Sequence, residues 1–185
     1  MISGPSGSGK TTLVKNLLKA VDLKTKLVKS VSFTTRPQRP GEVDGKDYFF
    51  ISEKQFRERQ KAKKILEWTR YLGYYYATSK EFIERYRKVG NHILLCLDLK
   101  GALKIKQAYS NNTVTIFIMP PSLEALRDRI RKRSHTTKEQ EISLRMRLAE
   151  KELLAARSYD HCVLNKELVA AVRELKKIVL EKIGL

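Results

Sequence analysis

The sequence predicts an α/β fold, with a central parallel sheet flanked by helices and a small β-rich subdomain inserted into it. Three observations support this prediction. Short aliphatic runs alternate with segments whose apolar residues recur at helical spacing, which is the pattern of repeated strand–helix–strand units. Between residues 33 and 79, several short strand-like runs follow one another around one helical segment. The chain has 185 residues, of which 42% are hydrophobic, enough for one domain with its own core.

The chain opens with residues 1–3, which predict the end of a strand, and because a core strand is normally longer we expect further residues upstream. Aliphatic and aromatic runs predict the later strands, at 27–33, 47–51, 65–71, 73–78, 93–97, 114–119 and 161–164. Apolar residues three and four apart predict the helices, at 12–21, 53–64, 79–89 and 101–109, and around 123–130, 142–153 and 168–179.

Turn formers separate these elements. Residues 34–45 contain Pro37, Pro40, Gly41 and Gly45, and they predict a long loop after the second strand. The segment 120–122, Pro-Pro-Ser, ends a strand and starts a helix.

Composition excludes several classes of protein. With 31% charged and 42% hydrophobic residues, the chain is not expected to be disordered. Its best aliphatic run, 93–97, is far too short to span a membrane, and the first residues lack the pattern of a signal peptide, so we expect a cytoplasmic protein without a membrane partner. Cys96 and Cys162 are flanked by aliphatic residues and are expected to be buried thiols rather than a disulfide or a metal site.

The chain is strongly basic, with a formal charge of +18. A lysine-rich solvated surface and an anionic partner both remain possible explanations. Part of the charge is concentrated at 126–133, which carries five cations and one anion. At helical spacing these cations cannot all face one site, so Arg127, Arg131 and Lys132 are expected to face solvent. Nucleic acid is not an expected partner.

Residues 4–11, Gly-Pro-Ser-Gly-Ser-Gly-Lys-Thr, match the phosphate-loop pattern G-x-x-x-x-G-K-[ST]. Glycines let backbone N–H groups turn inward around phosphate oxygens, and the N-terminus of the following helix favours the same charge. Lys10 adds a cation, and the Thr11 hydroxyl can bind Mg²⁺ that arrives with ATP. An ordinary glycine-rich turn is the structural alternative.

A second group of residues suggests a site for another phosphate and a base. Arg36 and Arg39 follow a strand on a turn-rich loop, where planar guanidinium groups can bind phosphate. Glu67 and Thr78 lie on later strands, close to tyrosines at 74–76. A carboxylate can accept hydrogen bonds from the adjacent N1–H and N2–H₂ groups of guanine, which adenine does not have.

These motifs together resemble the guanylate kinase family, over nearly the whole chain. The matching segments are 4–12, 30–48, 66–68, 75–79, 98–102, 120–122 and 159–165. The resemblance implies a P-loop kinase and the transfer of the ATP γ-phosphoryl group to GMP. It implies one domain, 1–185, with a core at 1–32 and 80–185, a GMP-binding subdomain at about 33–79 and a lid at about 127–147.

The resemblance also implies roles for single residues. The ATP site would contain Gly4, Pro5, Ser6, Gly7, Ser8, Gly9, Lys10, Thr11, Thr12 and Asn165. The GMP site would contain Ser32, Arg36, Arg39, Tyr48, Glu67, Tyr76, Thr78 and Asp98. The cations acting on the transferred phosphoryl group would be Lys10, Arg39, Arg133 and Arg145.

The chain departs from the family pattern at three places. Cys96 stands where the family usually has the first Asp of an Asp-x-Asp pair, and it cannot replace the charge of a carboxylate. The lid segment 133–138 has one extra residue, which bears on the alignment of Arg133 with Arg145. Lys166 replaces the usual Asp after Asn165, next to the expected adenine pocket.

Other interpretations remain for the same residues. Arg36 and Arg39 could be solvated loop charges, Glu67 a surface residue, and Asp98 a helix cap. His135 is expected to be an exposed lid residue. At the level of function, a guanylate-kinase-like module that binds phosphorylated peptides and a kinase acting on nucleic-acid ends are the competing hypotheses.

Overall fold

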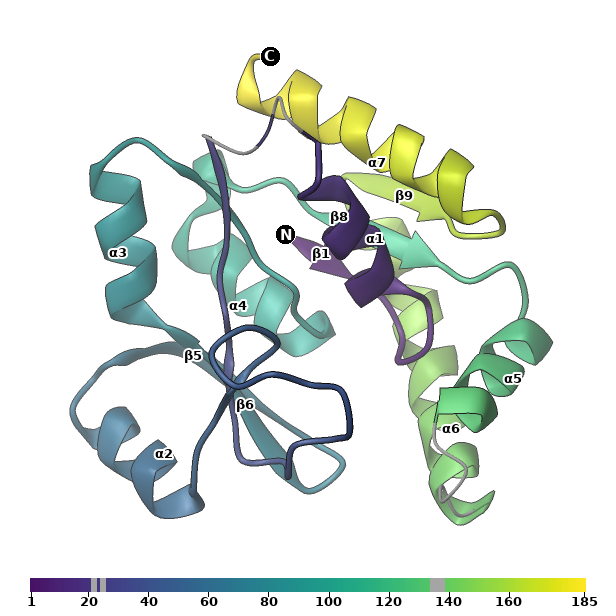
Figure 1. Ribbon diagram of the computed structural model, residues 1–185, viewed down its shortest axis with the longest axis horizontal. Helices are drawn as coiled ribbons and strands as arrows, with labels where there is room; N and C mark the ends of the chain where they lie inside the picture. Colours follow the sequence, from purple (N-terminus) through teal and green to yellow (C-terminus); the bar gives the residue numbers. More distant parts are fainter. Residues whose placement is uncertain (21–22, 24–25, 134–138) are drawn as a thin grey trace.

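Among the residues that the structure describes, the central sheet has five parallel strands. The computed structural model describes residues 1–20, 23, 26–133 and 139–185, without the side chain of Arg133. Strand β1 (Ile2–Ser3) pairs with β8 (Ile116–Met119), and β8 pairs with β9 (His161–Leu164). Strand β2 (Leu27–Lys29) pairs with β7 (His92–Leu94), and a bridge from Ile2 to Cys96 joins the two sets. The strand order is therefore β2-β7-β1-β8-β9, and β1, β8 and β9 are labelled in Figure 1.

Helices cover both faces of this sheet. Helices α1 (Lys10–Leu17) and α7 (Leu168–Ile183) pack together on one face, over the core residues Leu13, Leu17 and Leu175 (Figure 1). Helices α3 (Lys80–Lys88) and α4 (Leu99–Ala108) pack on the other face, over Leu95 and Leu97. Successive residues of one strand point to opposite faces, so each aliphatic run supplies both cores.

A second sheet lies beside the first. Its strands are β3 (Phe33–Thr34), β4 (Phe49–Phe50), β5 (Ile65–Tyr71) and β6 (Tyr74–Ser79), in the order β4-β3-β6-β5. Helix α2 (Glu53–Lys61) covers one side: its buried Phe56 stacks on Tyr75 at 4.4 Å and meets the edge of Trp68 at 5.9 Å. The ring of Tyr75 thus packs between the second sheet and helix α2.

Helices α5 (Leu123–Arg133) and α6 (Glu139–Leu154) form a pair with its own small apolar cluster. The cluster contains Leu126, Ile130, Ile142 and Ala149, spaced as the predicted helical faces require. Two short 3₁₀ turns, η2 (Ser110–Asn112) and η3 (Ala155–Ser158), complete the described elements.

Most predicted elements are present, with shifted ends, and two predictions were wrong. Residues 27–33 do not form one strand: β2 ends at Lys29, and Phe33 begins β3 in the other sheet. Nothing local marks this division, because it depends on which partner strand each half finds. The helix expected at 12–21 begins at Lys10 and ends at Leu17, and residues 21–22 lie outside the described part of the chain.

The second wrong prediction concerns Cys162, which is exposed rather than buried. It lies on β9, an edge strand of the central sheet, where Val163 points into the core and its neighbour points outward. Cys96 is partly buried against the core. Within the described ranges, no helix combines the length and apolar character needed to cross a membrane.

Candidate active site

The loop between β1 and α1 has the conformation that its glycines predict. Gly4 and Gly9 have φ of 138° and 94°, a region that residues with a Cβ rarely adopt. A Cβ on Gly4 would lie 2.5 Å from the carbonyl oxygen of Ile118, and one on Gly9 would lie 2.2 Å from Nδ2 of Asn165. The loop is thus packed directly against β8 and the residue after β9. It lies at the carboxyl end of β1, where the strand order changes direction, the usual ligand crevice of such sheets.

Asn165, the residue directly after β9, anchors this loop. It is buried, and its Nδ2 donates to the carbonyl of Ser8 over 2.7 Å. Arg129 in turn donates from Nη2 to the carbonyl of Asn165 over 3.1 Å. Sequence reasoning missed Arg129; its position three residues after the buried Leu126 distinguishes it from the outward cations of the same helix. Arg127 and Arg131 pair at the surface with Glu139, as expected of solvent-facing cations.

Lys10 begins α1, and its ammonium group lies against the loop itself. It donates to the carbonyls of Gly4 and Pro5, the latter over 2.9 Å. Thr11 and Thr12 are exposed on the first turn of the helix. The loop therefore presents a cation, two hydroxyls and a helix N-terminus at one place, a combination suited to phosphate.

Arg145 reaches the same loop from helix α6. It is buried, and its Nη1 donates to Oγ of Ser6 over 2.9 Å. Its Nε and Nη2 both donate to one carboxylate oxygen of Glu141, over 2.9 and 2.6 Å, which fixes the guanidinium plane. The predicted partner Arg133 and the lid residue His135 cannot be compared, because the Arg133 side chain and residues 134–138 lie outside the described part of the chain.

Glu67 and Thr78 form a buried polar pair on the neighbouring strands β5 and β6. Thr78 donates to Oε1 of Glu67 over 2.6 Å, and Glu67 is only 5% exposed. The other carboxylate oxygen, Oε2, is buried and accepts no hydrogen bond from any residue the structure describes. Burial raises the pKa of Glu67, as expected for a carboxylate withdrawn from water. The surface interpretation of Glu67 was therefore wrong.

Helix α4 begins directly beside this carboxylate. A Cβ on Gly101 would lie 2.8 Å from Oε2 of Glu67, so only glycine leaves the carboxylate in place. Asp98 caps the helix by accepting the Gly101 N–H over 2.8 Å, which confirms the helix-cap interpretation of Asp98. Its carboxylate also lies near enough to contribute to the raised pKa of Glu67.

Arg36 is not a solvated loop charge. It is 7% exposed, and its Nη2 donates to both oxygens of Glu42, over 2.8 and 2.9 Å. The backbone N–H of Arg39 also donates to Glu42, over 2.9 Å. Glu42, which the sequence analysis did not single out, thus organises the loop. The rings of Tyr48 and Tyr76 meet edge to face beside it, at 5.9 Å.

A cavity of about 170 Å³ separates this loop from α1. Its lining includes Thr11, Ser32, Tyr48 and Cys96, so the structure brings residues predicted for both sites to one space. Burial raises the pKa of the Cys96 thiol, which therefore adds no charge here. An ion pair from Lys15 to Asp47, 3.1 Å long, spans the cavity's edge, again linking α1 to the loop.

Comparison with known proteins agrees with this geometry. The guanylate kinase family model matches residues 1–182. A guanylate kinase of Thermotoga maritima is 45% identical over 179 residues, which cover 97% of this chain and 84% of that protein. One of Caldanaerobacter subterraneus is 44% identical over 181 residues, 97% of this chain and 85% of that protein. A crystal structure of guanylate kinase from Anaplasma phagocytophilum matches with a TM-score of 0.82 at 29% identity, covering 100% of this chain and 86% of that one.

Proposed function

This chain belongs to the guanylate kinase family, which phosphorylates GMP with ATP, and we propose how its residues divide that reaction. The phosphate loop and Asn165 form the ATP site, and the β-rich insertion forms the GMP site. In this proposal the core is 1–32 and 80–185, the GMP-binding subdomain about 33–79 and the lid about 127–147.

The ATP site uses backbone and cation together. Residues 4–12 supply inward N–H groups, and Lys10 exchanges its bonds to the loop carbonyls for bonds to phosphate oxygens. Asn165 keeps the loop in shape through Ser8 and borders the adenine.

Mg²⁺ would enter with ATP and be held by phosphate oxygens and the Thr11 hydroxyl. The donor set fits this, since the described residues contain no group of three or more His, Cys, Asp or Glu that could form a protein cage. Thr11 is exposed on the first turn of α1, next to Lys10. When bound, the ion neutralises charge on the phosphates.

The observation that carries the GMP site is the buried Oε2 of Glu67, which has no hydrogen-bond partner among the described residues. Buried carboxylate oxygens are rarely left without a donor, because the desolvation cost is then not offset. Guanine offers two adjacent N–H donors, and Thr78 and Asp98 flank the same place. Arg36, Arg39, Tyr48, Tyr76 and Ser32 surround the GMP phosphate.

Catalysis in this arrangement is positioning and charge stabilisation. The GMP phosphate oxygen is already an anionic nucleophile, so no general base is required. Lys10, Arg39, Arg133 and Arg145 offset the charge spread over the transferred group. Arg145 is already held at the loop by Ser6 and Glu141. Closure of the lid and the insertion excludes water, which would otherwise hydrolyse ATP.

A panel of GMP, AMP, UMP and CMP with ATP, in a coupled ADP-release assay, tests the assignment. We expect turnover with GMP and little with the other three. The Glu67→Ala variant should raise the KM for GMP far more than the KM for ATP, since the carboxylate contacts only the acceptor base. Equal effects on both constants would contradict the role of Glu67. Absence of GMP turnover in the wild type would instead favour the phosphopeptide-binding module.

A further inference from the structure

The cavity of about 170 Å³ has walls from the core and from the GMP-binding insertion. The core supplies helix α1, with Thr11, and the end of β2, with Lys29. The insertion supplies Ser32 and Tyr48 and part of the acceptor loop, which is the name used here for residues 35–48 between β3 and β4. A water molecule takes about 30 Å³ in the liquid, so the space accepts a phosphate group together with a few water molecules.

Both carboxylates in the lining already have donors from the protein. Glu42 accepts two hydrogen bonds from the guanidinium group of Arg36. Asp47 accepts the Val43 N–H over 3.0 Å and pairs with Lys15 at 3.1 Å. The Val43 N–H, then Lys15 and more weakly the charge of Lys29, lower the pKa of Asp47. The negative charges of the lining are therefore matched chiefly by Arg36 and Lys15.

Lys29 is the cation of the lining without an ion pair of its own. Its Nζ donates one hydrogen bond, over 3.2 Å, to the backbone carbonyl of Lys46 in the acceptor loop. Among the residues that the structure describes, no carboxylate forms an ion pair with it. An ammonium group has three donors, so two remain for a ligand.

Cys96 lines the same cavity and does not offset this charge. Lys29 pairs in register with Leu94, two residues before Cys96, so the sheet directs the side chains of Lys29 and Cys96 to one face. Burial raises the pKa of the Cys96 thiol, which is therefore neutral. Where the family usually has an aspartate, this chain thus has no negative charge beside Lys29.

The chemistry of the cavity favours an anionic ligand that accepts hydrogen bonds. Thr11, Ser32 and Tyr48 bring hydroxyl groups to it, and an ammonium group with hydroxyls around it suits phosphate oxygens. Ser32 and Tyr48 belong to the site proposed above for the GMP phosphate, whereas the ATP phosphates have the phosphate loop and Lys10. The ligand group that fits Lys29 is therefore the acceptor phosphate.

We propose that Lys29 is a further phosphate-binding residue of the GMP site, donating to the acceptor phosphate from the core side of the cavity. The proposal rests on the proposed function and adds a core residue to the arginines of the acceptor loop. The two remaining donors of the ammonium group would bind phosphate oxygens, while the bond to Lys46 stays in place. One cation would thus hold both the phosphate and the loop that surrounds it.

The Lys29→Met variant tests this, because it removes the charge and nearly keeps the length of the side chain. We expect the KM for GMP to rise roughly tenfold, as for the loss of a charge-assisted hydrogen bond, with the KM for ATP within about twofold of the wild type. Guanosine has the same base and no phosphate, so its inhibition constant against GMP should be the same in wild type and variant. Lys29→Arg keeps the charge and should have a KM for GMP closer to that of the wild type. Thermal melts establish that both variants are folded at the assay temperature.

The matched control is Lys46→Met. Lys46 is exposed on the acceptor loop and does not line the cavity, and it contacts Lys29 through its backbone carbonyl, which the substitution keeps. This variant removes the same charge close by, where solvent and salt screen it. Its KM for GMP should stay within about twofold of the wild type.

Four results would overturn the proposal. An unchanged KM for GMP in Lys29→Met would show that Lys29 does not bind the substrate. An equal weakening of GMP and guanosine would show that Lys29 only shapes the loop. An equal effect of Lys46→Met would reduce the result to the general field, and a larger rise of the KM for ATP would move Lys29 to the donor phosphates. Each of these leaves GMP phosphorylation intact, whereas a wild type that does not phosphorylate GMP would overturn the proposed function instead.

Discussion

Single side chains at the site are already held by hydrogen bonds to the protein itself. Lys10 donates to the carbonyls of Gly4 and Pro5, so the loop both positions this cation and satisfies it before a nucleotide binds. Arg145 is held in the same way by Ser6 and Glu141. The charges are thus preorganised, and little rearrangement is needed when phosphate charge develops.

Replacing Lys10 by alanine should therefore remove catalysis without unfolding the protein. We expect Lys10→Ala to lower kcat on the order of a thousandfold, since several kcal/mol of charge stabilisation are lost. Steady-state assays with saturating GMP measure this, and Lys19→Ala, an exposed lysine beyond the end of the same helix, is the matched control. Wild-type turnover by Lys10→Ala would contradict the role of the loop.

Gly101 offers a second test at the level of one residue. Its alanine variant places a Cβ 2.8 Å from Oε2 of Glu67 and 3.3 Å from Cδ, so the carboxylate must move. Gly101 lies inside α4 without a left-handed φ, and alanine favours helices there by about 1 kcal/mol.

We expect Gly101→Ala to raise the KM for GMP several-fold and to leave the KM for ATP nearly unchanged. A thermal melt should show that the variant is folded, which assigns the effect to the site. If both KM values rise together, or neither does, the Glu67 carboxylate does not require a glycine at position 101.

Among the secondary-structure elements, the junction of β8 and β9 depends on Asp160. Its carboxylate accepts from the N–H and the hydroxyl of Thr115, over 2.8 and 2.6 Å, and pairs with Lys106 at 3.1 Å. Its own N–H donates to the Thr115 hydroxyl over 2.9 Å. These bonds fix the starts of two neighbouring strands, and β9 leads directly to Asn165 under the phosphate loop.

Asp160→Asn should lower the free energy of unfolding by about 1–2 kcal/mol at pH 7, because the charge-assisted bonds are weakened. Burial works to raise the pKa of Asp160, but hydrogen bonds from Thr115 and Lys106 outweigh it and lower the pKa to about 2, from 3.8 in the unfolded chain. A carboxyl group whose pKa is lower in the folded state stabilises the folded protein at pH values above its unfolded-state pKa. This contribution to the free energy of unfolding is lost as the pH falls toward 2. Urea unfolding at pH 7, 4 and 3 should therefore show that the difference in the free energy of unfolding between wild type and variant shrinks below about pH 4. A constant difference would argue against an ionic origin of the stabilisation by Asp160.

Local sequence patterns predicted where strands and helices form better than they predicted which strands pair with one another. The strand at 65–71 was predicted with its observed ends, because a continuous run of aliphatic, aromatic and β-branched residues marks it locally. The division of 27–33 between two sheets depends on the separate partner strands of its two halves, β7 for one half and β4 and β6 for the other. The exposure of Cys162 depends on the position of β9 at the edge of the sheet. Such contacts leave no local pattern.

For the candidate site, the sequence predicted the types of functional group but not the hydrogen bonds that hold them in place. Residue types and spacing predicted the phosphate loop and singled out Glu67 and Arg36 as site candidates. They did not show that Glu42 holds Arg36 or that Asn165 supports Ser8. The contact of Asn165 with Ser8 joins segments that only the fold brings together, whereas Glu42 and Arg36 lie six residues apart in one loop.

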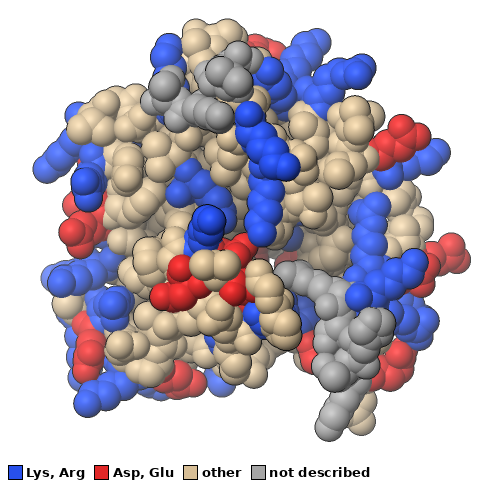
Figure 2. Space-filling model, in the orientation of Figure 1, with Lys and Arg blue, Asp and Glu red and all other residues tan. Residues whose placement is uncertain are grey.

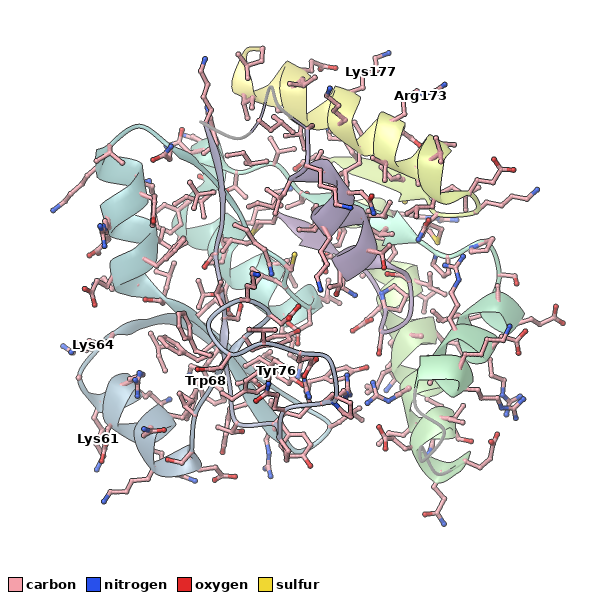
Figure 3. The ribbon with its side chains drawn as sticks, in the orientation of Figure 1. Lys61, Lys64, Trp68, Tyr76, Arg173 and Lys177 are labelled. Atoms are coloured by element: carbon pink, nitrogen blue, oxygen red, sulfur yellow. The ribbon has the colours of Figure 1, made fainter. Side chains whose placement is uncertain are left out.

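The positive charge is spread widely over the face of the molecule seen in Figure 2. Lysines and arginines are spread around the face seen in Figure 2, with a small acidic group near its centre. In Figure 3, Lys61 and Lys64 lie at the end of α2, while Arg173 and Lys177 project from the outer side of α7, on the opposite side of the molecule. A formal charge of +18 attracts small anions toward the molecule, and on the face in Figure 2 the cations are scattered mostly around its edge.

This distribution predicts how the reaction responds to salt. Since the Debye length falls from about 10 Å at 0.1 M salt to about 3 Å at 1 M, added KCl should screen the long-range attraction of GMP and MgATP. We expect kcat/KM for GMP to fall several-fold between about 0.05 and 0.5 M KCl, because the Debye length shortens over that range. The fall should come mainly from a higher KM, with kcat nearly constant. Sucrose at matched osmolarity is the control and should have little effect.

Two double charge reversals at the opposite surfaces then test whether the field is a sum of distant charges. Lys61→Glu with Lys64→Glu, and Arg173→Glu with Lys177→Glu, change the net charge by the same amount, and all four residues are exposed. A distributed field predicts that both pairs lower kcat/KM at low salt modestly and to a similar degree, and that both reduce its salt dependence. If one pair abolishes the salt dependence and the other leaves it unchanged, the charge at that surface acts locally, and a specific anion-binding surface replaces the distributed field as the explanation.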